Sequence, residues 1–221
     1  MTFITELENT FAANSNAENA LPMAKYMKDL FPFFGIKTDE RRALFKSVYK
    51  KHQVEINCKA RTIAWKLFTK KERELQYCGI EILIKNLKKN YVIDDIVWIE
   101  KLLITNSWWD SVDTISKYIL GDYLQQFPSE IDIVVKRFSN AENMWLNRSV
   151  ILFQLGYKSK TDFNILQSLC IQHSHSNAFF IRKAIGWALR EYAKTDPEAV
   201  REFVLQSNLK PLSKKEALKN I

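Results

Sequence analysis

Apolar residues recur with helical spacing along almost the whole chain. From about residue 3 to residue 205 they repeat at intervals of three to four positions, which places them on one face of an α-helix. The breaks are short, and residues 38–41, 161–162 and 195–198 carry the polar or proline signals with which helices start. The pattern predicts about a dozen helices of roughly 8–18 residues. Since no linker divides them, we expect an all-α fold with residues 1–221 as a single domain.

The composition excludes two other classes of protein. Five glycines and five prolines in 221 residues are less than half of the share that is usual in globular proteins. A β-sandwich or barrel needs many more of both for its tight turns. A disordered chain is also excluded, because 47% of the residues are hydrophobic and 13% are aromatic.

The glycines suggest how the helices are arranged. Gly35, Gly79, Gly121, Gly156 and Gly186 lie roughly 30–44 residues apart, which matches the period of a helix pair in repeat proteins. Amphipathic helices that cannot bury their faces alone would stack into a right-handed α-α superhelix, a solenoid of HEAT-like pairs. We expect its concave face to be basic. A globular helix bundle is the competing fold.

The charge balance favours a polyanionic partner. The formal net charge is +8 and the isoelectric point is about 9.3, so nucleic acid or an anionic membrane surface would be attracted. No apolar run approaches the roughly 20 residues that a membrane span requires. We therefore expect no membrane association, and a monomer is the expected state of a repeat protein that binds a duplex.

The chain start and the cysteines favour an intracellular protein. The first residues lack the basic segment and apolar core of a signal peptide. Cys58, Cys78 and Cys170 are odd in number and form no close pair, so we expect reduced thiols and a bacterial-type cytoplasmic location, with use at the nucleoid. They form no metal-spaced cluster with the three histidines, and we expect no metal.

Residues 107–115 form the most informative segment, in which Trp108 and Trp109 precede Asp113. Ser107 is the expected N-cap, because an acidic residue follows three positions later. Trp108 shares a helix face with apolar residues, whereas Trp109 stands one turn before Asp113 on the neighbouring polar face. Partial packing of Trp109 and a solvated Asp113 would explain the pattern without any function. A functional tryptophan–carboxylate pair is the alternative, and the segment taken by itself favours the non-functional explanation.

A second tryptophan lies among cations. At helical spacing, Trp187 shares its face with Lys183, Arg190 and Lys194. A ribose or base against the ring, with phosphates on the cations, would suit this face. The alternative is an aromatic ring covered by lysine stems.

Arg148 interrupts an apolar stripe. Its neighbours at helical spacing are Met144, Trp145, Ile151 and Leu152. An unpaired buried guanidinium is too costly, so Arg148 must meet either a carboxylate or a phosphate. Both alternatives remain open.

Three segments, residues 107–113, 145–148 and 183–194, together resemble the AlkD-type family of DNA alkylation repair glycosylases. Residues 22–28, 34–36, 40–42 and 211–217 are similar as well, so the resemblance spans nearly the whole chain. It implies a superhelix of HEAT-like pairs with double-stranded DNA across the concave face. It also implies excision of N7-alkylguanine and N3-alkyladenine. We expect no cofactor.

The resemblance also implies roles for individual residues. Asp113 matches the catalytic carboxylate, Trp109 and Trp187 match the flanking tryptophans, and Arg148 matches the arginine on the phosphate side. Lys183 and Arg190, on the cationic face of Trp187, are the further candidates for DNA binding.

Two other functions remain open. A non-catalytic helical-repeat scaffold could bind DNA structures or a protein partner, but a phosphate-binding face would gain nothing from Asp113. A lyase that nicks DNA through a lysine Schiff base would need a desolvated lysine, and none is evident in the sequence.

Overall fold

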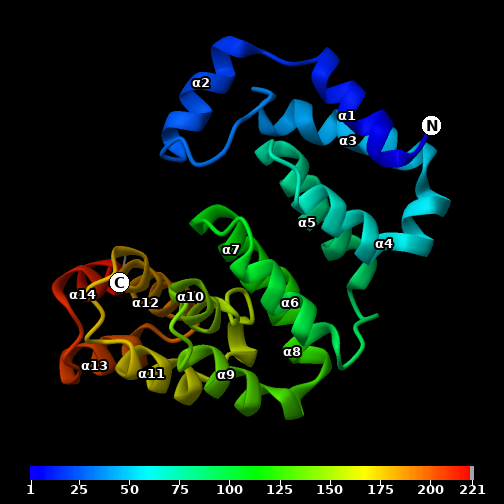
Figure 1. Cartoon of the computed structure of the whole chain (residues 1–221). Coiled ribbons are helices and arrows are strands. Elements are labelled where there is room, and N and C mark those ends of the chain that lie inside the picture. Colours follow the sequence, from blue (N-terminus) through cyan, green and yellow to red (C-terminus); the bar gives the residue numbers. More distant parts are fainter. Residues whose placement is uncertain (220–221) are drawn as a thin grey trace. The chain divides into compact units, whose positions relative to one another are not determined.

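The computed structural model describes residues 1–219, and all of its regular secondary structure is helical (Figure 1). The all-α prediction is confirmed, and the order of the helices is consistent with an α-α superhelical repeat fold. The chain forms two compact units, residues 1–90 and the residues from Tyr91 onward. In the part of the chain described here, no helix has the length and hydrophobicity of a membrane-crossing segment.

The first unit contains five α-helices. They are α1 (Phe3–Ala13), α2 (Ala17–Tyr26), α3 (Thr38–Lys51), α4 (Gln53–Phe68) and α5 (Arg73–Leu87). Helix α1 buries Phe3, Leu7 and Phe11, one residue per turn, and packs against α3 and α4. Helices α4 and α5 approach closely, because Gly79 has no side chain and a Cβ there would lie 2.7 Å from the Ala64 carbonyl oxygen.

The second unit holds the residues that the sequence singled out. It consists of α6 (Asp95–Ile104), α7 (Trp109–Ile115), the π-helix η1 (Ser116–Leu120), α8 (Gly121–Gln126), η2 (Pro128–Glu130), α9 (Ile131–Ser139), α10 (Met144–Leu152), η3 (Lys158–Lys160), α11 (Phe163–Gln172), α12 (Phe179–Tyr192), α13 (Pro197–Gln206) and α14 (Pro211–Ala217). Helix α10 packs against α12, and α12 packs against α14 (Figure 1).

The helix expected from Trp108 onward differs from the prediction at its start. Ser107 is not the N-cap, because its hydroxyl donates to the Leu103 carbonyl (2.6 Å) at the end of α6. Trp108, in extended conformation, is the N-cap of α7, and its side chain makes no capping hydrogen bond. The serine therefore satisfies an orphan carbonyl of the preceding helix instead of an orphan N–H of the next one.

The same helix is also interrupted further along. One turn of π-helix separates α7 from α8, and the Ser116 hydroxyl within it donates to the Val112 carbonyl (2.6 Å). Of the stripe predicted to be core, Val112, Ile115 and Ile119 are fully buried, whereas Trp108 is half-buried. A π-turn widens the helix locally and occurs frequently beside functional sites. Here it directly follows the turn that carries Asp113.

Gly186 allows α12 and α14 to pack without a side chain between them. A Cβ at this position would lie 2.4 Å from the Glu216 Cβ and 2.8 Å from the Ser213 carbonyl oxygen. We expect Gly186→Ala to lower the free energy of unfolding by about 1–3 kcal/mol, the usual penalty for overpacking. This penalty exceeds the gain of about 0.5–1 kcal/mol from replacing a helical glycine.

Thermal unfolding followed by circular dichroism measures the effect of Gly186→Ala. A protein of this length loses about 2–4 °C of Tm for each kcal/mol. An unchanged or higher Tm would show that α14 moves away freely and that the close approach has no structural importance.

Candidate functional site

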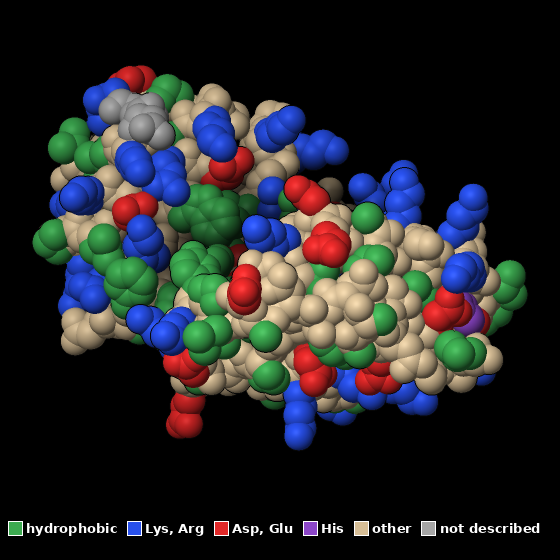
Figure 2. All heavy atoms as spheres, turned by 90° about the horizontal axis from the view of Figure 1, so that it is seen from above, with side chains coloured by type: hydrophobic (Ala, Val, Ile, Leu, Met, Phe, Trp, Pro, Cys, Tyr) green, Lys and Arg blue, Asp and Glu red, His purple; other side chains and the backbone are tan. Residues whose placement is uncertain are grey.

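A pocket of about 310 Å³ in the second unit is lined by four helices. All six site residues expected from the sequence lie in it. Asp113 and Trp109 come from α7, Arg148 from α10, and Lys183, Trp187 and Arg190 from α12; Phe179, Phe180 and Glu216 complete the lining. On the face seen in Figure 2, lysine and arginine side chains are interspersed with exposed hydrophobic side chains.

Asp113 and Arg148 form a bidentate ion pair at one side of the pocket. Arg148 Nε donates to Asp113 Oδ1 (2.7 Å), and Nη2 donates to Oδ2 (2.9 Å). The third nitrogen, Nη1, donates to the Phe180 carbonyl. The Arg148 side chain is only 5% exposed and that of Asp113 is 12% exposed. Of the two partners that the sequence left open for Arg148, the structure shows the carboxylate.

The pKa of Asp113 is raised above the usual value of an aspartate. Burial is the main cause, because it disfavours the charged form, and the nearby Asp110 adds to it. The two hydrogen bonds and the positive charge of Arg148 act in the opposite direction. Arg148 therefore helps to keep a buried carboxylate ionised. Each Asp113 oxygen retains a second lone pair for a ligand in the pocket.

Aromatic rings pack behind the ion pair. The Phe180 ring lies 5.0 Å from Trp108, 5.2 Å from Trp145 and 5.5 Å from Phe179, centroid to centroid. Because Phe180 also supplies the carbonyl that accepts from Arg148, this packing fixes the guanidinium and, through it, the carboxylate. The outer ring, Phe179, is 54% exposed.

Glu216 is the charged residue of the lining that the sequence did not single out, and Phe179 and Phe180 are the two aromatic ones. The Glu216 carboxylate accepts from Lys183 Nζ (2.9 Å) and from Arg190 Nη1 (2.8 Å), so it joins the two cations expected to bind DNA. These two ion pairs lower the pKa of Glu216. The signal that could have found it is Gly186, whose missing side chain lets α14 approach α12.

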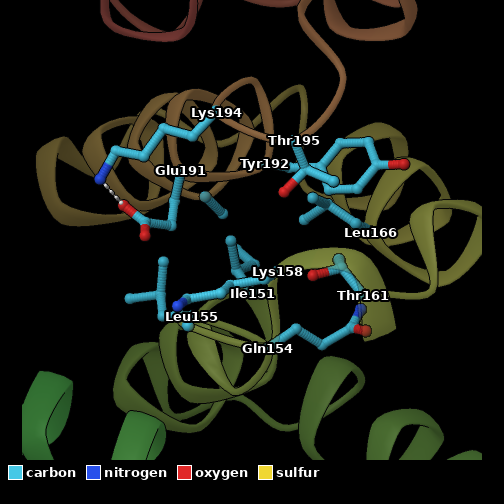
Figure 3. A pocket seen from close by; sticks show the side chains of 12 residues that line it. Ile151, Gln154, Leu155, Lys158, Thr161, Leu166, Glu191, Tyr192, Lys194 and Thr195 are labelled. Atoms are coloured by element: carbon cyan, nitrogen blue, oxygen red, sulfur yellow. Dashed lines mark hydrogen bonds and ion pairs between the residues drawn. The ribbon is translucent and has the colours of Figure 1, made fainter.

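Lys194 does not belong to this pocket. It was expected on the same face as Trp187, but it lies at a second pocket of about 240 Å³, between α12 and the segment from α10 to η3 (Figure 3). There it pairs with Glu191 in the last turn of α12 (Nζ to Oε2, 2.6 Å), as the dashed line in Figure 3 marks. The aliphatic side chains of Ile151, Leu155 and Leu166 line the remainder of that pocket. None of the expected site residues lines it.

The described residues also hold no site for a metal ion. Within residues 1–219, histidine, cysteine, aspartate and glutamate side chains form no group of three that could ligate one.

The pocket combines cations, which can bind phosphate, with aromatic rings, on which a base or sugar can pack, and this combination suits a protein that acts on nucleic acid. The family model for DNA alkylation repair enzymes matches residues 7–221, and the chain belongs to this family. Its role is therefore DNA repair, and DNA is the partner that membership implies.

A solved structure agrees with this assignment. The chain is similar to a protein from Enterococcus faecalis that is described as a predicted DNA alkylation repair enzyme. The two sequences are 33% identical, the match covers 94% of this chain and 96% of the other, and the TM-score is 0.84. No curated protein sequence matches.

Proposed function

We propose that the protein is a monofunctional DNA glycosylase. It hydrolyses the N-glycosidic bond of positively charged alkylpurines in double-stranded DNA, such as N7-alkylguanine and N3-alkyladenine, and leaves an abasic site. The observation that carries the proposal is the ion pair of Asp113 with Arg148, which fixes a buried carboxylate at the wall of a cationic, aromatic pocket.

The substrate class suits a pocket with this set of groups. A purine alkylated at N7 or N3 carries a positive charge and leaves as a neutral base, so the reaction needs no strong general acid. Cleavage passes through an oxocarbenium-like sugar, and a fixed carboxylate stabilises the developing positive charge. Asp113 takes this role, and it also positions the water that attacks the sugar.

The other lining residues take supporting roles. Trp109 and Trp187 hold the sugar and attract its positive charge with their ring faces. Lys183 and Arg190 bind phosphate, because their side chains remain 37% and 26% exposed at the pocket. Arg148 is a positioning residue for Asp113, since its nitrogens already donate to the carboxylate and to the Phe180 carbonyl.

Base release from matched duplexes tests the proposal. The duplexes are identical except for one guanine, which is unmodified, alkylated at N7 (cationic) or alkylated at O6 (uncharged). Mild alkali converts each abasic site into a strand break that a gel resolves, and the breaks found in duplexes incubated without protein are subtracted, because alkali alone also attacks N7-alkylguanine. We expect breaks only in the duplex with the cationic base. Equal release of the uncharged base would contradict the role of substrate charge, and no release from any duplex would refute the glycosylase activity.

A further inference from the structure

Glu216 is the acidic residue of the pocket that the proposed chemistry does not use. It lies on α14, and its carboxylate oxygens accept from Lys183 Nζ and from Arg190 Nη1, both on α12. Arg190 Nη1 also donates to the Glu216 backbone carbonyl (3.3 Å). One residue of α14 thus holds two cations of α12 through three contacts.

Stability alone does not explain this arrangement. Ion pairs in which the cations are this accessible contribute little to the free energy of folding. The Glu216 side chain is 16% exposed and is paired with both cations, so its charge is not buried without a partner. A glutamate beside residues that must attract DNA also reduces their net charge from two to about one, which opposes phosphate binding.

The geometry of the two cationic head groups gives Glu216 a role that its charge does not explain. A lysine has a flexible stem and three donors, and an arginine has five donors in a planar fork. Glu216 engages one side of each head group and leaves further N–H groups for another anion. With Gly186 allowing the close approach of α14, the carboxylate holds both cations at the pocket that also contains Asp113.

We propose that Glu216 is a positioning residue, which fixes Lys183 and Arg190 so that together they receive one backbone phosphate of the DNA at the pocket. This proposal rests on the proposed function for its effect on base release, whereas its effect on DNA binding requires only that the protein binds DNA, which family membership implies. The Glu216 carboxylate thus lowers the affinity for DNA, but it fixes the position of the bound strand relative to Asp113.

Glu216→Gln tests the proposal because glutamine keeps the length of the side chain and removes its charge. We expect the variant to bind unmodified duplex more tightly than wild type, with a salt dependence steeper by up to about 0.9 in the slope of log affinity against log salt. In the same variant we expect base release to be about tenfold to a hundredfold slower in single turnover, since a small misplacement of a bound substrate has effects of this size. Opposite changes in binding and release are the signature of a positioning residue.

Glu198→Gln is the matched control. Glu198 is on α13, is 79% exposed and pairs only loosely with Arg201 (3.6 Å), so this variant has the same change in net charge away from the pocket. If Glu216→Gln and Glu198→Gln behave alike, the proposal is overturned. It is also overturned if Glu216→Gln weakens binding and release together with a loss of Tm, because that would be a purely structural effect.

A double-mutant cycle that measures duplex affinity tests this proposal independently of the proposed glycosylase activity. The change in duplex affinity caused by Glu216→Gln should differ from its wild-type size in a protein that carries Lys183→Ala and Arg190→Ala, because these two cations are the groups that the Glu216 carboxylate holds. An unchanged effect in that background would overturn the proposal. If the wild type releases no base, the glycosylase proposal fails, and this cycle alone decides the role of Glu216.

Discussion

Asp113→Asn is expected to lower the rate of base release by about a hundredfold to a thousandfold, which corresponds to the loss of one group that stabilises charge in a transition state. The amide keeps the size of the side chain and can still accept a hydrogen bond from Arg148, but it no longer carries the negative charge opposite the sugar. Duplex affinity should not fall, because the substitution removes a negative charge from the pocket. Single-turnover kinetics on a duplex with one 7-methylguanine measures the rate directly.

Asp110→Asn is the matched control for this substitution. Asp110 lies on the same helix and its charge raises the pKa of Asp113, but it does not line the pocket. Its variant should release base at close to the wild-type rate. Release by Asp113→Asn at the wild-type rate would mean that the carboxylate has no part in the chemistry.

The pH dependence of release should identify the same group. Because burial raises the pKa of Asp113, the wild-type rate should fall as the pH decreases through this raised pKa, where the carboxylate becomes protonated and neutral. The Asp113→Asn variant has no such group and should lack this decrease.

Arg148→Met is expected to produce the largest loss of stability, about 3–5 kcal/mol at neutral pH. Methionine fills much of the volume of the arginine stem, but the buried carboxylate of Asp113 loses both of its hydrogen bonds and its counter-charge. The Phe180 carbonyl loses its donor as well. Unfolding in urea, followed by circular dichroism, measures the change.

The double variant Arg148→Met/Asp113→Asn separates the ion pair from simple packing. It should be more stable than Arg148→Met alone at neutral pH, because it no longer contains an unpaired buried charge. Equal stabilities would show that the arginine acts through packing only.

The pH dependence of Arg148→Met should have a definite sign. Without the arginine, burial raises the pKa of Asp113 in the folded state further above its value in the unfolded state. The unfolded state then releases this proton more readily, so stability decreases as the pH rises through the folded-state pKa. We therefore expect the loss of stability to be small at acid pH and largest at neutral pH.

Helical spacing predicted the local features of the site. Trp109 and Asp113 lie one turn apart on α7, and Lys183, Trp187 and Arg190 share a face of α12, as a period of 3.6 residues requires. Arg148 was expected to need an anionic partner because it interrupts an apolar stripe. Its actual partner, Asp113, lies 35 positions earlier, and a helical period carries no information over such a distance.

The predictions for Ser107 and Lys194 differ from the structure and Glu216 was not predicted, and each difference has a physical reason. The Ser107 hydroxyl could satisfy either the helix before it or the helix after it, and a capping pattern does not decide between them. Lys194 has the spacing of the cationic face but finds a nearer anion in Glu191. Residues 211–217 resemble the family, but the resemblance assigned no role to Glu216, because its place beside Lys183 and Arg190 depends on how α14 packs against α12 at Gly186.

The most direct test of the glycosylase proposal is a mass spectrum of the lesion-bearing strand after a single turnover by the wild-type protein. We expect free 7-methylguanine together with one uncleaved strand that has lost this base and carries an abasic site. An unchanged strand that remains bound to the protein would contradict the account and leave a DNA-binding scaffold. A strand cleaved at the lesion without alkali would instead indicate a lyase.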